Sequence, residues 1–77
     1  MDKRLLSLTS RGIERILKKM NFKKSRTKGI HIQFIGVISG SKKRVTLIAN
    51  QSHFTAKTIK SIIEQSGLNE YIWLTYL

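Results

Sequence analysis

The sequence predicts an α+β fold in which two helices pack on one face of an antiparallel three-stranded sheet. Two amphipathic stretches with helical spacing lie at residues 9–21 and 55–67. Between them, two segments alternate apolar and polar residues as half-buried strands do, and a third, cationic segment precedes these. The order of helix, strands and helix is typical of two packed layers around one hydrophobic core.

The first helix is predicted over residues 9–21, TSRGIERILKKMN. Its charged residues lie on one face, and its apolar residues recur on the other at Ile13, Ile16, Leu17 and Met20. Thr9 or Ser10 is expected to cap the start of the helix, and Asn21 to end it in the left-handed conformation. Phe22 then returns the chain to the core.

The first two strands differ in the strength of their patterns. The first, KKSRTKG, is a run of cations and small polar residues that ends in a glycine. In the second, IHIQFIGVI, alternation sends Ile30, Ile32 and Phe34 toward the helices. His31 is therefore expected to face away from the core.

A turn and a third strand complete the predicted sheet. SGSKK, residues 39–43, has the composition of a turn, and RVTLIA, residues 44–49, repeats the alternation with Val45 and Leu47 inward. Two strands joined this closely are expected to form a hairpin.

The second helix is predicted for TAKTIKSIIEQSG, with Thr55 as its N-cap and Gly67 as its C-terminal stop. Phe54 and Ile59 are placed to form a hydrophobic staple at its start. A short third helix is expected to begin at Asn69 in the apolar tail NEYIWLTYL. This order of elements is the architecture of the double-stranded RNA-binding domain, and a chain of 77 residues is expected to form one such domain.

Charge is the most informative feature of the composition. Fifteen Lys and Arg residues against four Asp and Glu residues give a formal net charge of +11. Such an excess predicts a polyanionic partner. The alternatives are RNA, DNA, an acidic membrane surface and an acidic protein. The absence of cysteine excludes disulfides and thiolate metal ligands. No segment approaches the ~18 apolar residues of a membrane span, so we expect a cytoplasmic protein that inserts into no membrane.

Most enzyme classes lack support from the sequence. The four acids are scattered, and His31 and His53 have no recognisable metal-ligand spacing, so we expect neither a metal site nor a cofactor. RNA cleavage stays open, because the 2′-hydroxyl of the substrate can itself attack the adjacent phosphate. The protein then needs a group that moves protons near neutral pH, as histidine does, and cations that hold the phosphate. The cations that closely precede His31 are Lys24, Arg26 and Lys28.

Residues 9 to about 68 resemble the HicA family of bacterial toxins, small ribonucleases that cleave mRNA and are neutralised by an antitoxin called HicB. The resemblance lies in IERILKKMNF, in KGIHIQF at the family's Gly-Ser-His strand motif, in RVTLIAN and in TIKSIIEQSGL. It implies a double-stranded-RNA-binding-domain-like fold and a catalytic role for the motif histidine. His31 and Gly29 match the motif, and Ile30 stands where the family has serine.

The leading hypothesis is a metal-independent endoribonuclease toxin that cleaves mRNA and arrests translation in a stress response, with His31 as general acid or base. Lys24, Arg26 and Lys28 are expected to position the phosphate, and Gly29 to let the backbone come close to it. The alternatives are a non-catalytic RNA-binding module of the same fold, a degenerate inactive toxin relative, and a protein-interaction element whose cations serve only an acidic partner.

A partner is also expected. The resemblance implies a HicB-like antitoxin, and the charge of the chain favours an acidic one. We expect this antitoxin to cover His31 and the cations around it. Trp73 in the apolar tail is the candidate anchor for the desolvated centre that a long-lived complex needs.

Overall fold

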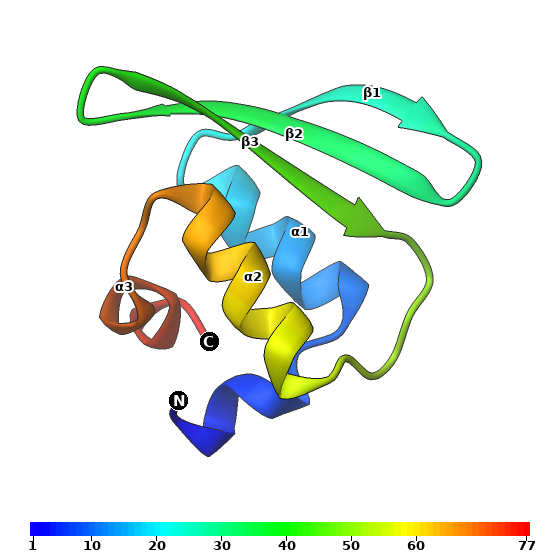
Figure 1. Cartoon of the computed structure of the whole chain (residues 1–77), viewed down its shortest axis with the longest axis vertical. Helices are drawn as coiled ribbons and strands as arrows, with labels where there is room; N and C mark the ends of the chain where they lie inside the picture. Colours follow the sequence, from blue (N-terminus) through cyan, green and yellow to red (C-terminus); the bar gives the residue numbers. More distant parts are fainter.

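The computed structural model describes all residues from Met1 to Leu77 and has a three-stranded sheet with helices on one side (Figure 1). The predicted order of α, β, β, β, α and a short C-terminal helix is confirmed. The elements are η1 (a 3-10 helix, Lys3–Ser7), α1 (Ser10–Lys19), β1 (Lys23–Lys28), β2 (His31–Ile38), β3 (Ser41–Ile48), α2 (Ala56–Ser66) and α3 (Glu70–Thr75). None of the helices has the length and apolar character that crossing a membrane requires.

The strands form an antiparallel sheet in the order β1-β2-β3, so β2 is central and β1 and β3 are the edges. The turn between β2 and β3 consists of Ser39 and Gly40, whose φ angles of 51° and 79° are typical of two-residue hairpin loops. The turn predicted for SGSKK is therefore too long, because Ser41 already begins β3.

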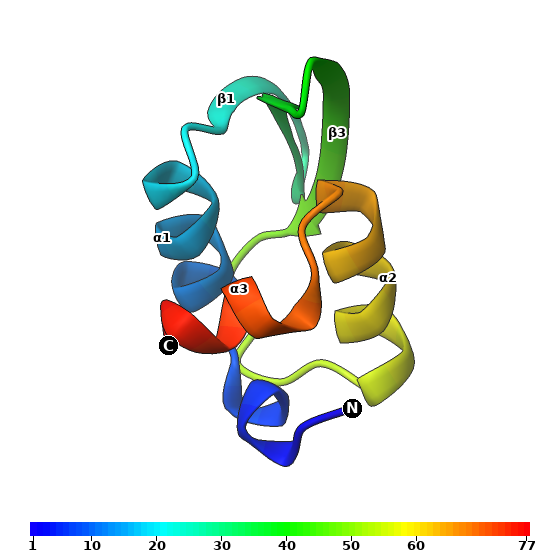
Figure 2. The same ribbon diagram turned by 90° about the vertical axis from the view of Figure 1, so that its left-hand side faces the viewer.

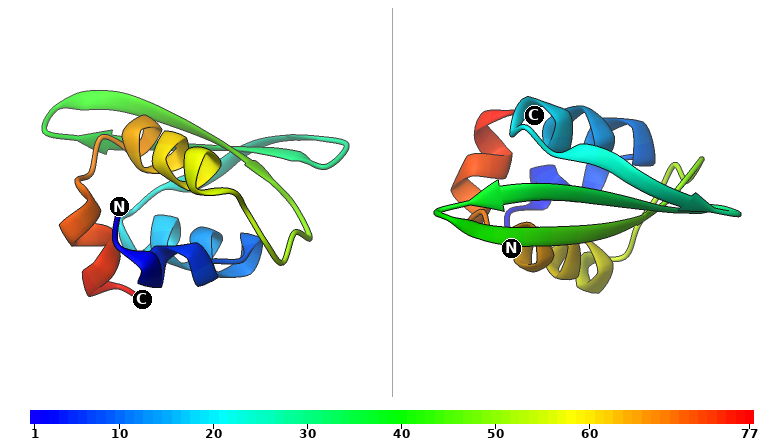
Figure 3. Two further views of the ribbon diagram at one scale, coloured as in Figure 1. Left: turned by 60° about the horizontal axis from the view of Figure 1, so that its bottom comes forward. Right: turned by 90° about the horizontal axis from the view of Figure 1, so that it is seen from above.

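The two long helices cover the same face of the sheet, as predicted. Seen from above the sheet, α1 runs beside β1 and α2 runs beside β3 (Figure 3). α3 lies at one end of the helical layer, across the gap between α1 and α2 (Figure 2). No helix covers the other face of the sheet, which we call the open face.

The predicted caps fix the helix ends. The side chains of Thr9 and Thr55 each accept a hydrogen bond from a backbone N–H in the first turn of α1 and α2. Asn21 follows α1 with a φ of 67°, and Gly67 ends α2 with a φ of 73°. Asn69 caps α3 in the same way as the two threonines.

One hydrophobic core lies between the sheet and the helices. Its members come from every element except β1, and they are Leu5, Leu8, Ile13, Ile16, Leu17, Phe22, Ile32, Phe34, Val45, Leu47, Phe54, Ile59, Ile62, Ile63 and Trp73. The first two belong to the segment around η1, which the sequence did not predict because it is too short to show a helical period.

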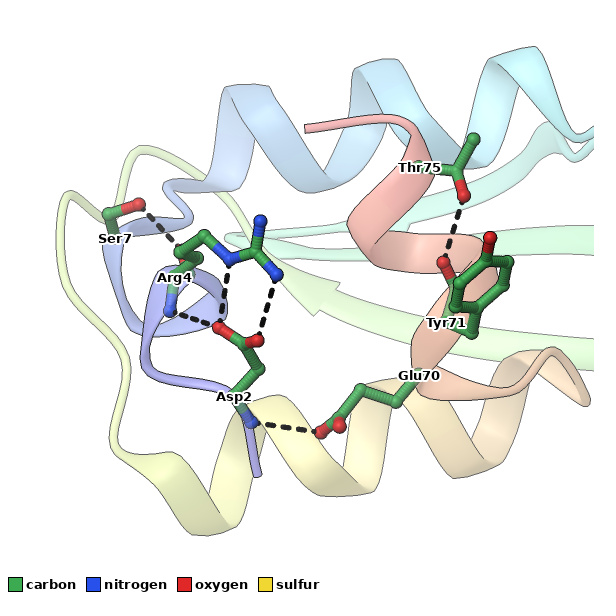
Figure 4. Close-up of polar contacts among 6 residues, drawn as sticks. All are labelled: Asp2, Arg4, Ser7, Glu70, Tyr71 and Thr75. Carbon is green, nitrogen blue, oxygen red and sulfur yellow. Dashed lines mark hydrogen bonds and ion pairs between the residues drawn. The ribbon is translucent and has the colours of Figure 1, made fainter.

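Polar contacts tie the two ends of the chain together (Figure 4). The Asp2 N–H donates to Glu70 Oε1 over 3.3 Å, which links the segment before η1 to α3. The Arg4 side chain donates two hydrogen bonds to the Asp2 carboxylate, with 2.9 Å between Nη2 and Oδ2, and the Arg4 backbone N–H donates a third. These hydrogen bonds lower the pKa of Asp2 from its ordinary 3.8 to about 2.

Candidate functional site

His31 is the first residue of β2 and is exposed on the open face of the sheet. Its neighbour Ile32 and the next inward residue, Phe34, are buried against the helices. Because side chains alternate along a strand, His31 and Gln33 lie on the other face. The predicted orientation of His31 is confirmed.

Two cations of β1 stand beside this histidine. In the antiparallel register, Lys28 lies opposite His31 and Arg26 lies opposite Gln33. These four residues line a hollow of about 230 Å³, which we call the His31 hollow. Directly opposed residues of an antiparallel pair have side chains within contact distance of one another, so the imidazole lies in a positively charged setting.

Lys24 lies on the other face. It is paired with Phe34, whereas Arg26 is paired with Gln33, so Ser25 is an extra residue that forms a β-bulge. The bulge shifts the alternation by one, and Lys24 points to the helix side, with its Nζ 3.8 Å from Glu14 Oε2 of α1. The structure therefore brings Arg26 and Lys28 to His31 but not Lys24.

The turn between β1 and β2 consists of Gly29 and Ile30. Gly29 has a φ of 59°, a conformation that glycine adopts without strain, and a Cβ there would meet no atom within 4 Å. Ile30 is 55% exposed, so the prediction that it points into the core is wrong. The reason is that Ile30 belongs to the turn, where the alternation of the strand has not yet begun.

The second histidine, His53, lies in the loop between β3 and α2 and is exposed. Its backbone carbonyl accepts a hydrogen bond from Gln51 Nε2 over 3.0 Å. His53 is thus a loop residue, and it does not line the His31 hollow.

Trp73, the candidate anchor for a partner, is not exposed at the surface. Its side chain is fully buried, and its Nε1–H donates to Ser66 Oγ over 3.1 Å. An amphipathic turn of α3 directs this ring into the core, where burial of its large apolar surface stabilises the fold. The strand register places three apolar residues on the open face: Val37, which is 67% exposed, and Ile35 and Ile48, which are half-buried.

Most of the carboxylates already have polar partners, and none lines the His31 hollow. Asp2 pairs with Arg4, and Glu70 accepts from the Asp2 N–H. Glu14 pairs with Lys18, with 2.8 Å between Oε2 and Nζ. No three His, Asp or Glu side chains come together in a way that could hold a metal ion. The hollow itself contains only an imidazole, an amide and two cations.

A larger groove lies on the helix side of the sheet, and the sequence did not predict it. It has a volume of about 1040 Å³ and runs between α1 and the loop that follows β3; we call it the α1 groove. Ser10 links this end of α1 to the end of β3 and to the loop after it, because its Oγ donates to the Ile48 carbonyl (2.6 Å) and accepts from the Gln51 N–H (2.8 Å). The ionic residues that line the groove are Arg11, Glu14, Arg15, Lys18, Lys19 and Lys24.

Comparison with known protein families gives a match. A family model described as the HicA toxin of bacterial toxin–antitoxin systems matches residues 10–68, which is more than half of the chain. The matched segment begins with α1 and includes the three strands and α2. It contains the His31 hollow and every residue that lines the α1 groove except Thr9. No curated protein matches the chain at a significant level.

Proposed function

The chain belongs to the HicA toxin family of bacterial toxin–antitoxin systems, and on this premise we propose that it is an endoribonuclease that cleaves mRNA in the cytoplasm, without a metal ion, and so arrests translation. His31 is the catalytic residue of this proposal. The observation that carries it is the His31 hollow, where the imidazole is open to a substrate and lies beside Arg26 and Lys28.

The reaction needs one proton to leave and another to arrive. The 2′-oxygen of a nucleotide attacks the adjacent phosphorus, and the bond between phosphorus and the 5′-oxygen of the next nucleotide breaks. A 2′,3′-cyclic phosphate forms, the 2′-hydroxyl loses its proton, and the 5′-oxygen gains one. A histidine is suited to accept the first proton or to donate the second, because it exchanges protons near neutral pH.

The cations of the hollow stabilise the phosphate during this reaction. Negative charge builds up on the phosphate oxygens in the transition state, and positioned donors lower its energy. The guanidinium of Arg26 suits this role, since it can donate two parallel hydrogen bonds to one phosphate. Gly29 has no side chain and open space around it, so the substrate can come close to the backbone beside Lys28.

The partner of this proposal is an acidic HicB-like antitoxin that covers the open face. Charge attraction speeds the encounter of such a pair, while a desolvated apolar centre slows its dissociation. Val37 supplies an exposed apolar side chain on the open face, opposite Lys42 in the register. An antitoxin that packs on Val37 and pairs with the surrounding cations also blocks access to His31.

The nature of the products tests the proposal. We expect the purified chain to cut RNA in the presence of EDTA, to leave 2′,3′-cyclic phosphate ends or their hydrolysis product, and to spare DNA, which has no 2′-hydroxyl. Cleavage that EDTA abolishes and magnesium restores, in a preparation free of contaminating nuclease, contradicts the mechanism. If the chain binds RNA but never cuts it, the result favours the non-catalytic RNA-binding module. This is the second candidate function, because Ile30 stands where the motif of the family has serine.

A further inference from the structure

The α1 groove has no part in the reaction described above. We propose that it is a second RNA-binding site, which holds the phosphate backbone away from the cleaved bond, and that Glu14 competes with the phosphates for its cations. The inference rests on the proposed function, because it takes RNA to be the ligand. The second site lies on the opposite side of the sheet from His31.

The cations of α1 form a row along the groove. Arg11, Arg15 and Lys18 are separated by four and three residues, so they lie on one side of the helix and span ~10 Å of its axis. Lys24 of β1 adds a cation from a neighbouring strand. A row of positive charges fits a linear polyanion such as a nucleic acid backbone.

Two of the cations have further contacts with Tyr76, the residue that follows α3. Arg15 Nη1 lies 3.4 Å from the Tyr76 carbonyl, and Lys19 Nζ lies 5.8 Å from the centre of the Tyr76 ring. Arg11 has no such partner, and Lys18 is paired only within the groove. Arg11 and Lys18 are therefore the residues whose removal disturbs the rest of the fold least.

Glu14 is the single anion of the groove. Its Oε2 lies 2.8 Å from Lys18 Nζ and 3.8 Å from Lys24 Nζ. One carboxylate oxygen thus occupies the place between two cations that a phosphate oxygen would take. The hydrogen bond from Lys18 keeps the pKa of Glu14 below its usual value, so this oxygen is charged at neutral pH. Because ion pairs at a surface are weak, RNA can displace Glu14 at little cost.

The lining of the groove favours a nucleic acid over a protein. Its apolar members are Ile32, Leu47 and Ala49, and the first two are almost completely buried in the core. Protein interfaces are usually built around apolar side chains that lose water on binding. The α1 groove presents few of these, whereas the open face presents Val37.

β1 connects the α1 groove to the His31 hollow. Lys24 lines the groove, Arg26 and Lys28 line the hollow, and the bulge at Ser25 lies between them. All residues of this edge strand are exposed. An RNA strand that crosses the edge of the sheet at β1 therefore meets cations along its whole path, from the groove to the catalytic histidine.

Two matched pairs of variants test the inference. Binding is measured as a function of salt with a 2′-O-methyl RNA, which cannot be cleaved because its nucleophile is blocked. Glu14→Gln is compared with Glu64→Gln, which removes one negative charge from the exposed side of α2. The double variant Arg11→Glu/Lys18→Glu is compared with Lys57→Glu/Lys60→Glu, which reverses two exposed charges of α2. Thermal melting checks that each variant is folded.

We expect Glu14→Gln to bind RNA about two- to fivefold more tightly than Glu64→Gln does, which is the size of a surface ion pair. We expect the double variant of α1 to reduce the slope of log affinity against log salt by ~1.4 more than its α2 control, because each contact with a single strand contributes ~0.7.

Suppose that the parent binds and cleaves RNA but the two variants of each matched pair have equal affinities for RNA. This result overturns the second site and leaves the proposed function intact. A parent that binds no RNA even at low salt overturns both. If the α1 double variant does not fold, the comparison of Glu14→Gln with Glu64→Gln still tests whether the second site exists. Neither of these two changes introduces a charge.

Discussion

Lys24 and Arg26 lie on opposite faces of the sheet, although only one residue separates them. The register pairs Lys24 with the inward Phe34 and Arg26 with the outward Gln33, and Ser25 between them is the bulge. One extra residue thus divides the cations of β1 between two surfaces. A cluster that is continuous in the sequence is thus divided between the α1 groove and the His31 hollow.

This division predicts different kinetic effects for the two cations. Arg26→Ala is expected to lower the maximum rate of RNA cleavage by about tenfold or more, because the transition state loses a donor. Lys24→Ala is expected to keep the maximum rate within about twofold of that of the parent. It is also expected to raise the RNA concentration at which half of the maximum rate is reached. Single-turnover cleavage at several protein concentrations measures both quantities. Equal losses of maximum rate in the two variants contradict the division.

Val37 is predicted to contribute to antitoxin binding and not to RNA cleavage. Val37→Asp puts a negative charge on the exposed apolar part of the open face, where an acidic partner would pack. We expect the complex to dissociate at least about tenfold faster, since a like charge then faces the partner across a desolvated contact. Surface plasmon resonance with an acidic protein that inhibits RNA cleavage by the chain measures this rate. An unchanged rate means that the antitoxin binds elsewhere.

Trp73 is predicted to matter for stability. Trp73→Phe removes the hydrogen bond to Ser66 Oγ and some buried surface, so we expect it to lower the free energy of unfolding by about 1–3 kcal/mol. Tyr71→Phe is the control on the same helix, because Tyr71 is exposed and its change should cost less than about 0.5 kcal/mol. Urea unfolding compares them, and equal midpoints would show that the tail is not part of the core.

The contact between Asp2 and Arg4 predicts an acid dependence of stability. The pKa of Asp2 is lowered in the folded state, so its ionised form favours folding above the unfolded value near 3.8. This contribution is lost as the pH falls toward about 2, where the folded carboxyl also binds a proton. We therefore expect the parent to melt at a higher temperature than Asp2→Asn at pH 5, with a difference that shrinks as the pH falls toward 2. A difference of the same size at pH 5 and pH 2 indicates another cause.

Local patterns in the sequence were sufficient for most of the fold. Side-chain alternation placed His31 on the open face, and Thr9, Asn21, Thr55 and Gly67 gave the ends of both long helices. These features depend on residues close together in the chain. Local chemistry therefore determines these features, and they can be predicted directly from the sequence.

The candidate site was predicted only in part, because its details depend on pairing between strands and on packing. The bulge at Ser25 is a property of the register with β2, and nothing in KKSRTKG marks it. Ile30 looks like the start of a strand, but the turn takes it out of the core. The α1 groove joins residues of α1, β1 and the loop after β3, which only the fold brings together.

Cleavage by two histidine variants is the most direct test of the central claim that His31 moves the proton. His31→Ala and His53→Ala make the same chemical change at two exposed positions, one in the hollow and one in a loop. We predict that His31→Ala lowers the single-turnover rate of RNA cleavage by at least about 100-fold, that His53→Ala retains the parent rate, and that both melt like the parent. A folded His31→Ala variant that cleaves RNA at the parent rate contradicts the account.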